Sequence, residues 1–243
     1  MTVQEPWLDE IAAARHGMDR SSTATRVADV FREKIADGRL VPGTRLSDDK
    51  LAAVMGVSRN TMREAFQMLV KERLLVHEFN RGVFVSRVPA GALADLYRVR
   101  RILECEGVRS ARDAGAAALA RVEAAVLEGE HAAAAGNWAD VGTADIKFHK
   151  ALAALMGSPR VDEMIGHLLV EMRLVFHEMG SPREFHEPYL ARNRRLYDLM
   201  AQGDFVKAEA ELRSYLDDAE AQLTKAYRDK ERSQRPGATA RSS

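Results

Sequence analysis

A run of five residues has side chains that suit contact with DNA. Its members are Arg59, Asn60, Thr61, Met62 and Arg63. Arginine can donate two hydrogen bonds to guanine, asparagine can pair in the same way with adenine, and threonine can hold a phosphate. A basic residue taken alone is usually a solvated surface group, so the interpretation depends on the elements that present these side chains.

Asp145 and His149 form a second pair of chemically useful side chains. Their spacing of i and i+4 would place them one turn apart on the same face of a helix. A carboxylate oxygen and an imidazole nitrogen in this arrangement can bind one metal ion. The same spacing also suits a salt bridge or a buried polar contact, and from these two residues alone both interpretations stay open.

Two short predicted helices position the run that begins at Arg59. The first starts at Ser47, whose hydroxyl can cap it, and two acids then face the positive end of the helix dipole. The turn over residues 56–58, with sequence GVS, leads into a second helix that Ser58 caps and that ends near Glu72. Two short helices joined by a glycine-containing turn are typical of a helix-turn-helix, whose second helix enters the major groove.

A β-hairpin is predicted after these helices. Residues 74–79 and 83–85 have the composition of strands, and the turn between them carries Arg81 and Gly82. A hairpin with a basic tip suits the adjacent minor groove or the DNA backbone. Together with an amphipathic helix before the pair, this order predicts a winged helix-turn-helix domain over residues 20–88, with the hairpin as its wing.

The charge is unevenly distributed, although 36 Lys and Arg residues balance 36 Asp and Glu residues over the whole chain. Residues 20–88 hold thirteen basic residues against eight acidic ones. A basic segment joined to a larger, mildly acidic one is typical of a nucleic-acid-binding domain attached to a second module. The single cysteine, Cys105, excludes an intramolecular disulfide framework and suits a reducing compartment.

No segment has the character of a membrane span or of a secretory signal. The apolar runs are far shorter than the roughly 20 residues that cross a bilayer. The first residues carry acids where a secretory signal would have basic residues and then an apolar stretch. We therefore expect a cytoplasmic protein without a membrane partner.

Helical periodicity dominates the larger segment, residues 89–230. Glycine and proline interrupt it often enough to leave about six helices with short connections, which favours an antiparallel all-α bundle. Residues 1–19 form an N-terminal extension in which Trp7 and Leu8 could pack on a partner subunit. The polar tail 231–243 is expected to be disordered. The predicted fold class is mainly α, with a small β-hairpin wing.

Three motifs in the basic segment match a known family. They are G-x-L-x-P-G-x-x-L-S, LA-x-x-x-GVSR-x-x-x-RE-A and N-R-G-x-F-V. In these motifs the segment resembles the DNA-binding domain of GntR-family bacterial transcription regulators. The resemblance implies a DNA-binding surface made of Arg45, Ser58, Arg59, Asn60, Thr61, Arg63, Arg81 and Gly82. Arg73 stands where the family usually has glycine, so the wing keeps its usual position if Arg73 adopts the backbone conformation that ends the helix there.

The helical segment has three features of a second known domain. Leu96 to Glu104 contains an arginine followed four positions later by glutamate, and the run Asp145 to Leu152 reads DIKFHKAL. Residues 201–204 form the turn between the last two helices, with no insertion or deletion against the known domain. In these features the segment resembles the FCD ligand-binding domain of the FadR-like branch of the GntR family. The resemblance implies a helical bundle that binds an effector and forms a homodimer.

The resemblance also implies a site around Asp145 and His149. Many FCD domains complete a metal site there with two further histidines, but here Asn193 and Tyr215 stand at those positions, and both are poor ligands for zinc or nickel at neutral pH. One alternative is a degenerate site for a divalent metal, zinc or nickel, held by Asp145, His149 and Asn193. The other is a metal-free pocket for an anionic effector, formed by Arg100, Arg101, Asp145, His149, Asn193 and Tyr215. Three other histidines are interpreted as structural or surface residues: His167, His177 and His186.

These features predict a homodimeric transcription regulator that binds double-stranded operator DNA. Repression is the expected sense of regulation, and a small organic acid or another anionic metabolite is the expected effector. One alternative is a scaffolding adaptor whose winged helix binds protein. Another is a metal-dependent enzyme in a helical bundle. A di-iron site there needs two Glu-x-x-His pairs that face each other, and the segment Glu184 to Glu187 is too short to supply one.

Overall fold

The computed structural model describes residues 23–177, 179 and 181–234. Their contacts divide the chain into two units, of which the first contains residues 23–35 and 40–86. The second contains residues 36–39 and the described residues from Arg87 onward. The predicted boundary lies between residues 88 and 89, and the contacts divide the chain between Ser86 and Arg87. The predictions made for residues 1–19 lie outside the described residues.

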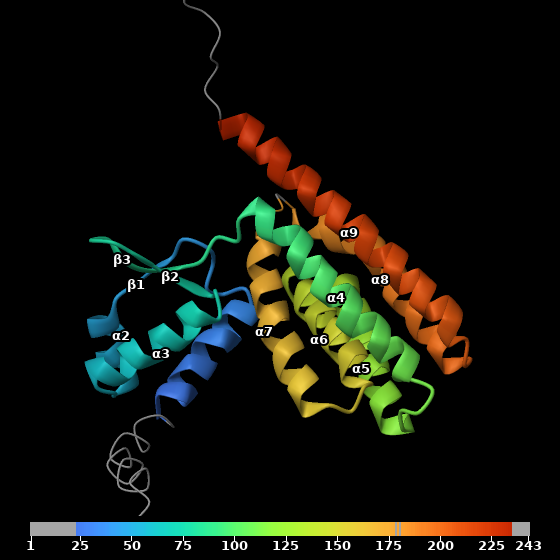
Figure 1. The fold of residues 1–243 in the computed structure, drawn as a ribbon. Helices are drawn as coiled ribbons and strands as arrows, with labels where there is room; N and C mark the ends of the chain where they lie inside the picture. The colour runs from blue at the N-terminus through green and yellow to red at the C-terminus, as the bar shows by residue number, and fades with distance from the viewer. Residues whose placement is uncertain (1–22, 178, 180, 235–243) are drawn as a thin grey trace, which may run out of the picture. The chain divides into compact units, whose positions relative to one another are not determined.

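The first unit combines helices with a small sheet (Figure 1). Its described elements are a helix over residues 23–36, β1 (Arg45–Leu46), α2 (Asp48–Met55), α3 (Arg59–Lys71), β2 (Leu75–Glu78) and β3 (Gly82–Val85). Phe31 of the first helix meets Phe66 of α3 edge to face, with the ring centroids 5.5 Å apart. Arg32 donates two hydrogen bonds to the carboxylate of Glu72 at the end of α3. The first helix and α3 are therefore joined by both apolar and charged contacts.

The sheet is antiparallel and has the order β1-β3-β2. β2 pairs with β3 in the register expected of the predicted hairpin, with Leu75 opposite Val85 and Glu78 opposite Gly82. β1 pairs with the other edge of β3, where Arg45 lies opposite Phe84. No strand was predicted at Arg45 and Leu46. A two-residue strand has no periodicity of its own and forms because β3 offers a free edge.

Arg73 lies between α3 and β2 with a φ of 63°. This left-handed conformation is the one that glycine adopts readily at the end of a helix. Leu74 N then donates to Leu69 O at 2.9 Å, which closes the helix end. The chain thus enters the wing as it would with glycine, at a conformational cost of about 1–2 kcal/mol for a residue with a Cβ.

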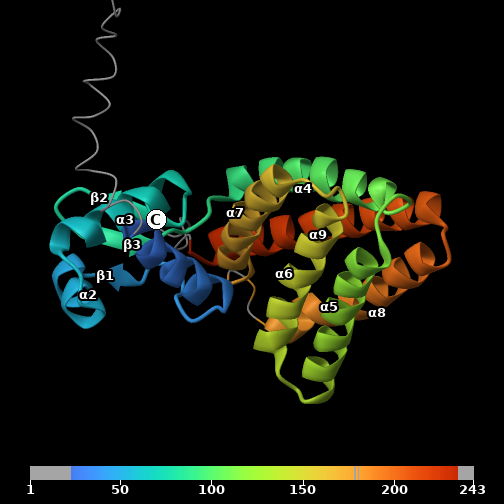
Figure 2. The same ribbon diagram turned by 90° about the horizontal axis from the view of Figure 1, so that it is seen from below.

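The second unit is a bundle of antiparallel helices (Figures 1 and 2). Its described helices are α4 (Ala90–Ser110), α5 (Ala116–Ala134), α6 (Trp138–Ala154), α7 (Pro159–Phe176), α8 (Pro182–Ala201) and α9 (Phe205–Gln234). Proline at the first position of α7 and of α8 is preorganised for a helix start. The connections are short, as the glycine and proline interruptions predict.

α6 is the central helix of this bundle, because it contacts α4, α5, α7 and α8. It lies very close to α4 at Gly107. A Cβ added to Gly107 would overlap the carbonyl oxygen of Leu152 and lie 2.8 Å from the carbonyl carbon of the same residue. Glycine is therefore required for the two backbones to meet. This packing brings the polar side chains of α6 into the interior of the bundle.

The described residues confirm the predicted fold class, since they are mostly helical with a small antiparallel sheet in the first unit. One boundary of the prediction is wrong. α9 continues to Gln234, so residues 231–234 of the expected disordered tail are helical, while residues 235–243 lie outside the described part of the chain. Among the described helices, none has the length and apolar character needed to cross a membrane.

Candidate DNA-binding surface and candidate effector site

α3 begins with the cap that the sequence predicts. The hydroxyl oxygen of Ser58 accepts a hydrogen bond from Thr61 N at 3.0 Å, and it lies 2.8 Å from the Thr61 hydroxyl oxygen. Thr61 is only 8% exposed. Its hydroxyl therefore belongs to the helix cap, and the structure does not present it as the phosphate contact that the sequence suggested.

Arg59 and Arg63 occupy the exposed face of the first turns of α3. Their side chains are 69% and 64% exposed. Arg59 Nε lies 2.8 Å from a carboxylate oxygen of Asp49, and Arg63 Nε lies 2.7 Å from one of Asp48. The hydrogen bond from Arg63 lowers the pKa of Asp48. Exposed ion pairs contribute little to stability, so each guanidinium group can leave its aspartate and bind DNA instead.

The other predicted DNA contacts lie on α3 and on the sheet. Asn60 is exposed and donates to Glu64 at 2.6 Å. Arg81 is exposed at the β2–β3 turn, where it pairs with Glu78 and lies over the ring of Phe84. Gly82 has a φ of 106°, a conformation that favours glycine, and an added Cβ there would lie 3.6 Å from Arg45 Nε.

A groove of about 1190 Å³ lies within the first unit, where α2 and α3 face the sheet. Its basic and imidazole side chains are Arg45, Lys50, Arg63, Lys71 and His77. Three of these, Lys50, Lys71 and His77, were not singled out from the sequence, because nothing in their local pattern distinguishes them from solvated surface residues. Asp48 and Asp49 also line the groove, but the basic side chains outnumber them, which is compatible with contact to a phosphate backbone.

The second unit brings four of the predicted effector residues together in its interior. Asp145 and His149 come from α6, Asn193 from α8 and Tyr215 from α9, and all four are buried. Tyr215 OH donates to Asp145 Oδ1 at 3.0 Å, and Asn193 Nδ2 donates to the same oxygen at 3.1 Å. His149 Nε2 lies 3.2 Å from Tyr215 OH. We call these four residues, with the Arg100 and Glu104 described next, the polar cluster.

Arg100 and Glu104 extend the polar cluster from α4. Arg100 Nε donates to Glu104 Oε1 at 2.6 Å, and His149 Nδ1 lies 2.6 Å from Glu104 Oε2. Both residues are fully buried. Burial alone would raise the pKa of Glu104, but the charges of Arg100 and His149 hold it below its usual value. The i, i+4 arginine and glutamate that marked the FCD resemblance thus form a buried ion pair that orients His149.

Arg101 does not join this cluster. It pairs with Asp217 and Glu220 on α9, and its Nε donates to Asp217 Oδ1 at 2.7 Å. Its charge is therefore already balanced away from Asp145. The expectation that Arg101 could bind an anion beside His149 is not supported by this placement.

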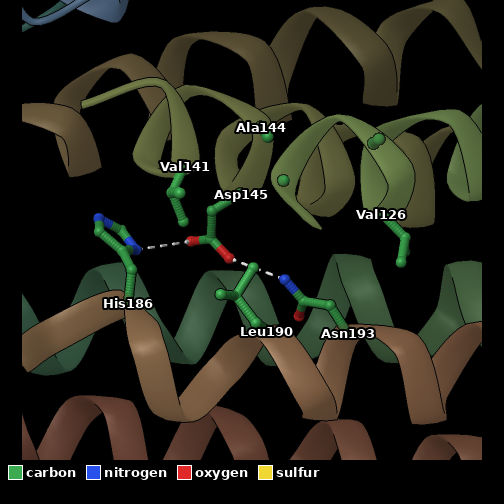
Figure 3. Close-up of a pocket in the computed structure, with 9 residues that line it drawn as sticks. Val126, Val141, Ala144, Asp145, His186, Leu190 and Asn193 are labelled. Carbon is green, nitrogen blue, oxygen red and sulfur yellow. Dashed lines mark hydrogen bonds and ion pairs between the residues drawn. The ribbon is translucent and has the colours of Figure 1, made fainter. Parts of the chain in front are cut away.

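His186 of α8 was interpreted as a structural or surface residue, but it is buried beside Asp145. Its Nδ1 lies 3.9 Å from Asp145 Oδ2, a distance too long for a hydrogen bond (Figure 3), and this nitrogen has no hydrogen-bond partner in the part of the chain that the structure describes. Burial lowers the pKa of His186, with Asp145 opposing this effect. A signal existed in the sequence, since His186 precedes Asn193 by two helical turns and so shares its face.

The side-chain atoms of the polar cluster that could bind a metal are not arranged for a zinc or nickel ion. Asp145 Oδ1, which would have to face the metal, accepts hydrogen bonds from Tyr215 and Asn193 instead. Burial and the nearby Asp145 raise the pKa of Tyr215 well above 10, so it stays a neutral donor. Among residues 23–177, 179 and 181–234, no group of three or more His, Cys, Asp or Glu side chains could hold a metal. The predicted set of Asp145, His149 and Asn193 is therefore not arranged for coordination.

A small cavity adjoins the polar cluster between α5, α6 and α8 (Figure 3). Its volume is about 10 Å³, which corresponds to about one water molecule. The lining combines apolar residues such as Val126 and Leu190 with Asp145, His186 and Asn193. A metabolite can therefore enter only if side chains or helices move.

The first unit is a winged helix-turn-helix with an exposed pair of arginines on its second helix, and it defines a class of DNA-binding proteins. Comparison with known proteins agrees with this class. Residues 23–85 match the family described as bacterial regulatory proteins, gntR family, and residues 95–218 match the FCD domain.

Two relatives match this chain along most of its length, and a third matches about a third of it. A transcriptional regulator GntR from Rhodococcus sp. RHA1 is 47% identical, with a TM-score of 0.78 over 85% of this chain and 99% of that chain. An uncharacterized HTH-type transcriptional regulator from an unstable DNA locus of Streptomyces ambofaciens is 30% identical over 82% of this chain and 85% of its own. The gluconate operon transcriptional repressor of Bacillus licheniformis is 37% identical over 36% of this chain and 35% of its own.

The chain belongs to the GntR family and is a DNA-binding transcriptional regulator with an FCD effector-binding domain. This class is not a class of enzymes, so the enzyme alternative finds no support in the family.

Proposed function

We propose that this protein is a cytoplasmic, homodimeric repressor whose affinity for operator DNA changes when a small organic-acid anion binds in its FCD domain. In the homodimer, two copies of α3 would enter successive major grooves about one helical turn of DNA apart. Repression is supported by the name of a relative, the gluconate operon repressor. The observation that carries the DNA-binding part is the exposure of Arg59 and Arg63 at the capped start of α3.

The test of DNA binding is the double variant Arg59→Ala, Arg63→Ala. Each arginine that pairs with a guanine contributes about 1–3 kcal/mol, and breaking its exposed pair with Asp49 or Asp48 offsets at most about 1 kcal/mol of that. With about 2 kcal/mol for each arginine and about 1 kcal/mol offset for each broken pair, we expect the double variant to lose about 2 kcal/mol, or about 30-fold, in affinity for an operator selected from random duplexes. Arg195→Ala is the matched control, because Arg195 is 70% exposed on α8.

Fluorescence anisotropy at several salt concentrations measures both affinity and its salt dependence. A steep fall of wild-type affinity with salt indicates phosphate contacts, whereas a protein-binding adaptor would show none with duplex DNA. Equal affinity of the double variant and of Arg195→Ala would refute the assignment of α3 as the helix that enters the DNA.

Allosteric control requires that the anion binds one conformation of the protein better than another. The change in operator affinity then equals the change that DNA causes in anion affinity. We expect operator titrations with and without a bound carboxylate to differ, and identical curves with a confirmed ligand would reject this control. The nature of the anion-binding group is taken up below.

A further inference from the structure

One buried arginine of the second unit has no ion pair within the described residues. Arg173 of α7 is 6% exposed. Its Nη2 donates to the carbonyl oxygen of Ala139 at 3.1 Å, and its Nε is buried without a hydrogen-bond partner. Burial lowers the pKa of Arg173, with Asp145 as the strongest opposing influence. A buried guanidinium with unused donors is costly.

Gly142 makes room for this guanidinium beside His186. A Cβ added to Gly142 would overlap Arg173 Nη1 and would lie 2.9 Å from His186 Nε2. Gly142 precedes Asp145 by about one turn of α6, and Asp145 in turn lies beside His186 (Figure 3). Arg173, His186 and Asp145 are therefore neighbours around one turn of α6, and two of them, His186 and Asp145, line the small cavity.

The other arginines that were considered for the effector site already form ion pairs. Arg100 is bound to Glu104, and Arg101 is bound to Asp217 and Glu220. Asp145 itself accepts hydrogen bonds from Tyr215 and Asn193. A guanidinium presents five N–H donors in a planar fork that matches a carboxylate. Of these three arginines, Arg173 is the one that is buried, has no carboxylate partner within the described part of the chain and keeps an N–H without a hydrogen bond.

We propose that Arg173 is the cation that binds the carboxylate of the effector, with His186 as a second hydrogen-bonding group. This inference rests on the proposed regulation by a small organic acid and names the residue that recognises it. Arg173 had no sequence signal, since α7 holds several other charged residues and no motif distinguishes this one from them. Because the adjoining cavity has a volume of only about 10 Å³, entry of the ligand requires the surrounding side chains or helices to move, and this movement couples binding to conformation.

The test compares Arg173→Met with Arg101→Met in the full chain. Thermal unfolding is measured with sodium acetate, succinate and citrate against sodium chloride at equal ionic strength. In wild type and in Arg101→Met we expect at least one carboxylate to raise Tm. In Arg173→Met we expect a Tm without ligand equal to or above that of wild type, because an unpaired buried charge is gone, and no rise with the same carboxylate.

Arg173→Lys gives a second measurement that does not depend on the behaviour of the Met variant. It keeps the charge but loses the fork, so we expect it to fold and to bind the carboxylate at least about tenfold more weakly than wild type. A carboxylate-induced rise in Arg173→Met equal to that of wild type would overturn the inference, as would a large loss of ligand-free stability in both Arg173 variants, which marks a structural role.

The failure of the inference differs from the failure of the proposed function. If carboxylates stabilise wild type and both Arg173 variants equally, the effector class stands and Arg173 is wrong. If none of the three carboxylates stabilises wild type, the proposed effector class and Arg173 fail together, while the Arg59 and Arg63 test of DNA binding is unaffected.

Discussion

Glu104→Gln is the substitution that most directly tests the buried ion pair beneath the effector site. Glu104 is fully buried, and its two oxygens meet Arg100 Nε and His149 Nδ1, each at 2.6 Å. Glutamine keeps the size of the side chain but replaces one acceptor by an NH2 group. Arg100 is then left buried without a carboxylate, and His149 loses the partner that orients it.

The expected loss follows from these contacts. Removing one partner of a buried pair costs about 3–5 kcal/mol, because an uncompensated charge remains inside. For a protein of this size each kcal/mol lowers Tm by about 2–4 °C, so we expect a fall of about 6–20 °C. Thermal unfolding followed by circular dichroism measures it. Glu106→Gln is the control on the same helix, since Glu106 forms an exposed pair with Arg109 and should leave Tm close to that of wild type.

The pH dependence gives a further check on the same contact. The pKa of Glu104 is lowered in the folded state, so its contribution to stability is present above the unfolded value of about 4.3 and is lost as pH falls below it. The difference between wild type and Glu104→Gln should therefore shrink below about pH 4. A Tm within about 2 °C of wild type at pH 7 would refute the reasoning, because it would mean that Arg100 needs no buried carboxylate.

Three other predictions concern stability and use the same unfolding measurement. Gly107→Ala should destabilise the protein by at least about 1–3 kcal/mol, because the added Cβ would overlap the Leu152 backbone. Gly166→Ala on α7 is the control: its added Cβ would have nothing within 4 Å, so we expect it to stabilise the protein by about 0.5–1 kcal/mol. A similar effect of the two substitutions would contradict the close approach of α4 and α6. Arg73→Gly should raise stability by about 0.5–1 kcal/mol, since it relieves a left-handed conformation of a residue with a Cβ, and a fall in Tm would show that the Arg73 side chain matters more than its backbone. The pKa of His186 is lowered by burial, so the unfolded chain takes up a proton below about pH 6.5 that the folded chain does not; the free energy of unfolding should fall between pH 7 and pH 5.5, and it should fall less in His186→Gln.

Local chemistry explains why the first unit was predictable from the sequence. The caps at Ser47 and Ser58 and the left-handed Gly56 with a φ of 65° are decided by residues within one turn of each other. The hairpin that forms the wing also depends on a short turn. The exposed positions of Arg59 and Arg63 follow from the periodicity of α3, so the basic surface could be placed before any tertiary contact was known.

The polar cluster was only partly predictable. The register of the helices brought Asp145, His149, Asn193 and Tyr215 together, as the FCD resemblance implied. The spacing of these residues along the chain could not show that Tyr215 and Asn193 would donate hydrogen bonds to Asp145, which makes its oxygen unsuited to bind a metal. Donor direction depends on the rotation of α8 and α9 against α6, which is set by packing between segments far apart in the chain.

Amino-acid sequence by itself determined the helices, their caps, the wing and the arginines on the exposed face of α3, because these depend on contacts within a few residues. Only the tertiary structure decided which arginine charges are balanced. Arg100 pairs with Glu104 on its own helix and Arg101 pairs with Asp217 on α9, whereas Arg173 donates to a backbone carbonyl and has no carboxylate partner among the described residues. The physical reason is that the free energy of a buried charge is set by the groups around it in space, and those groups come from helices whose mutual orientation no local pattern encodes.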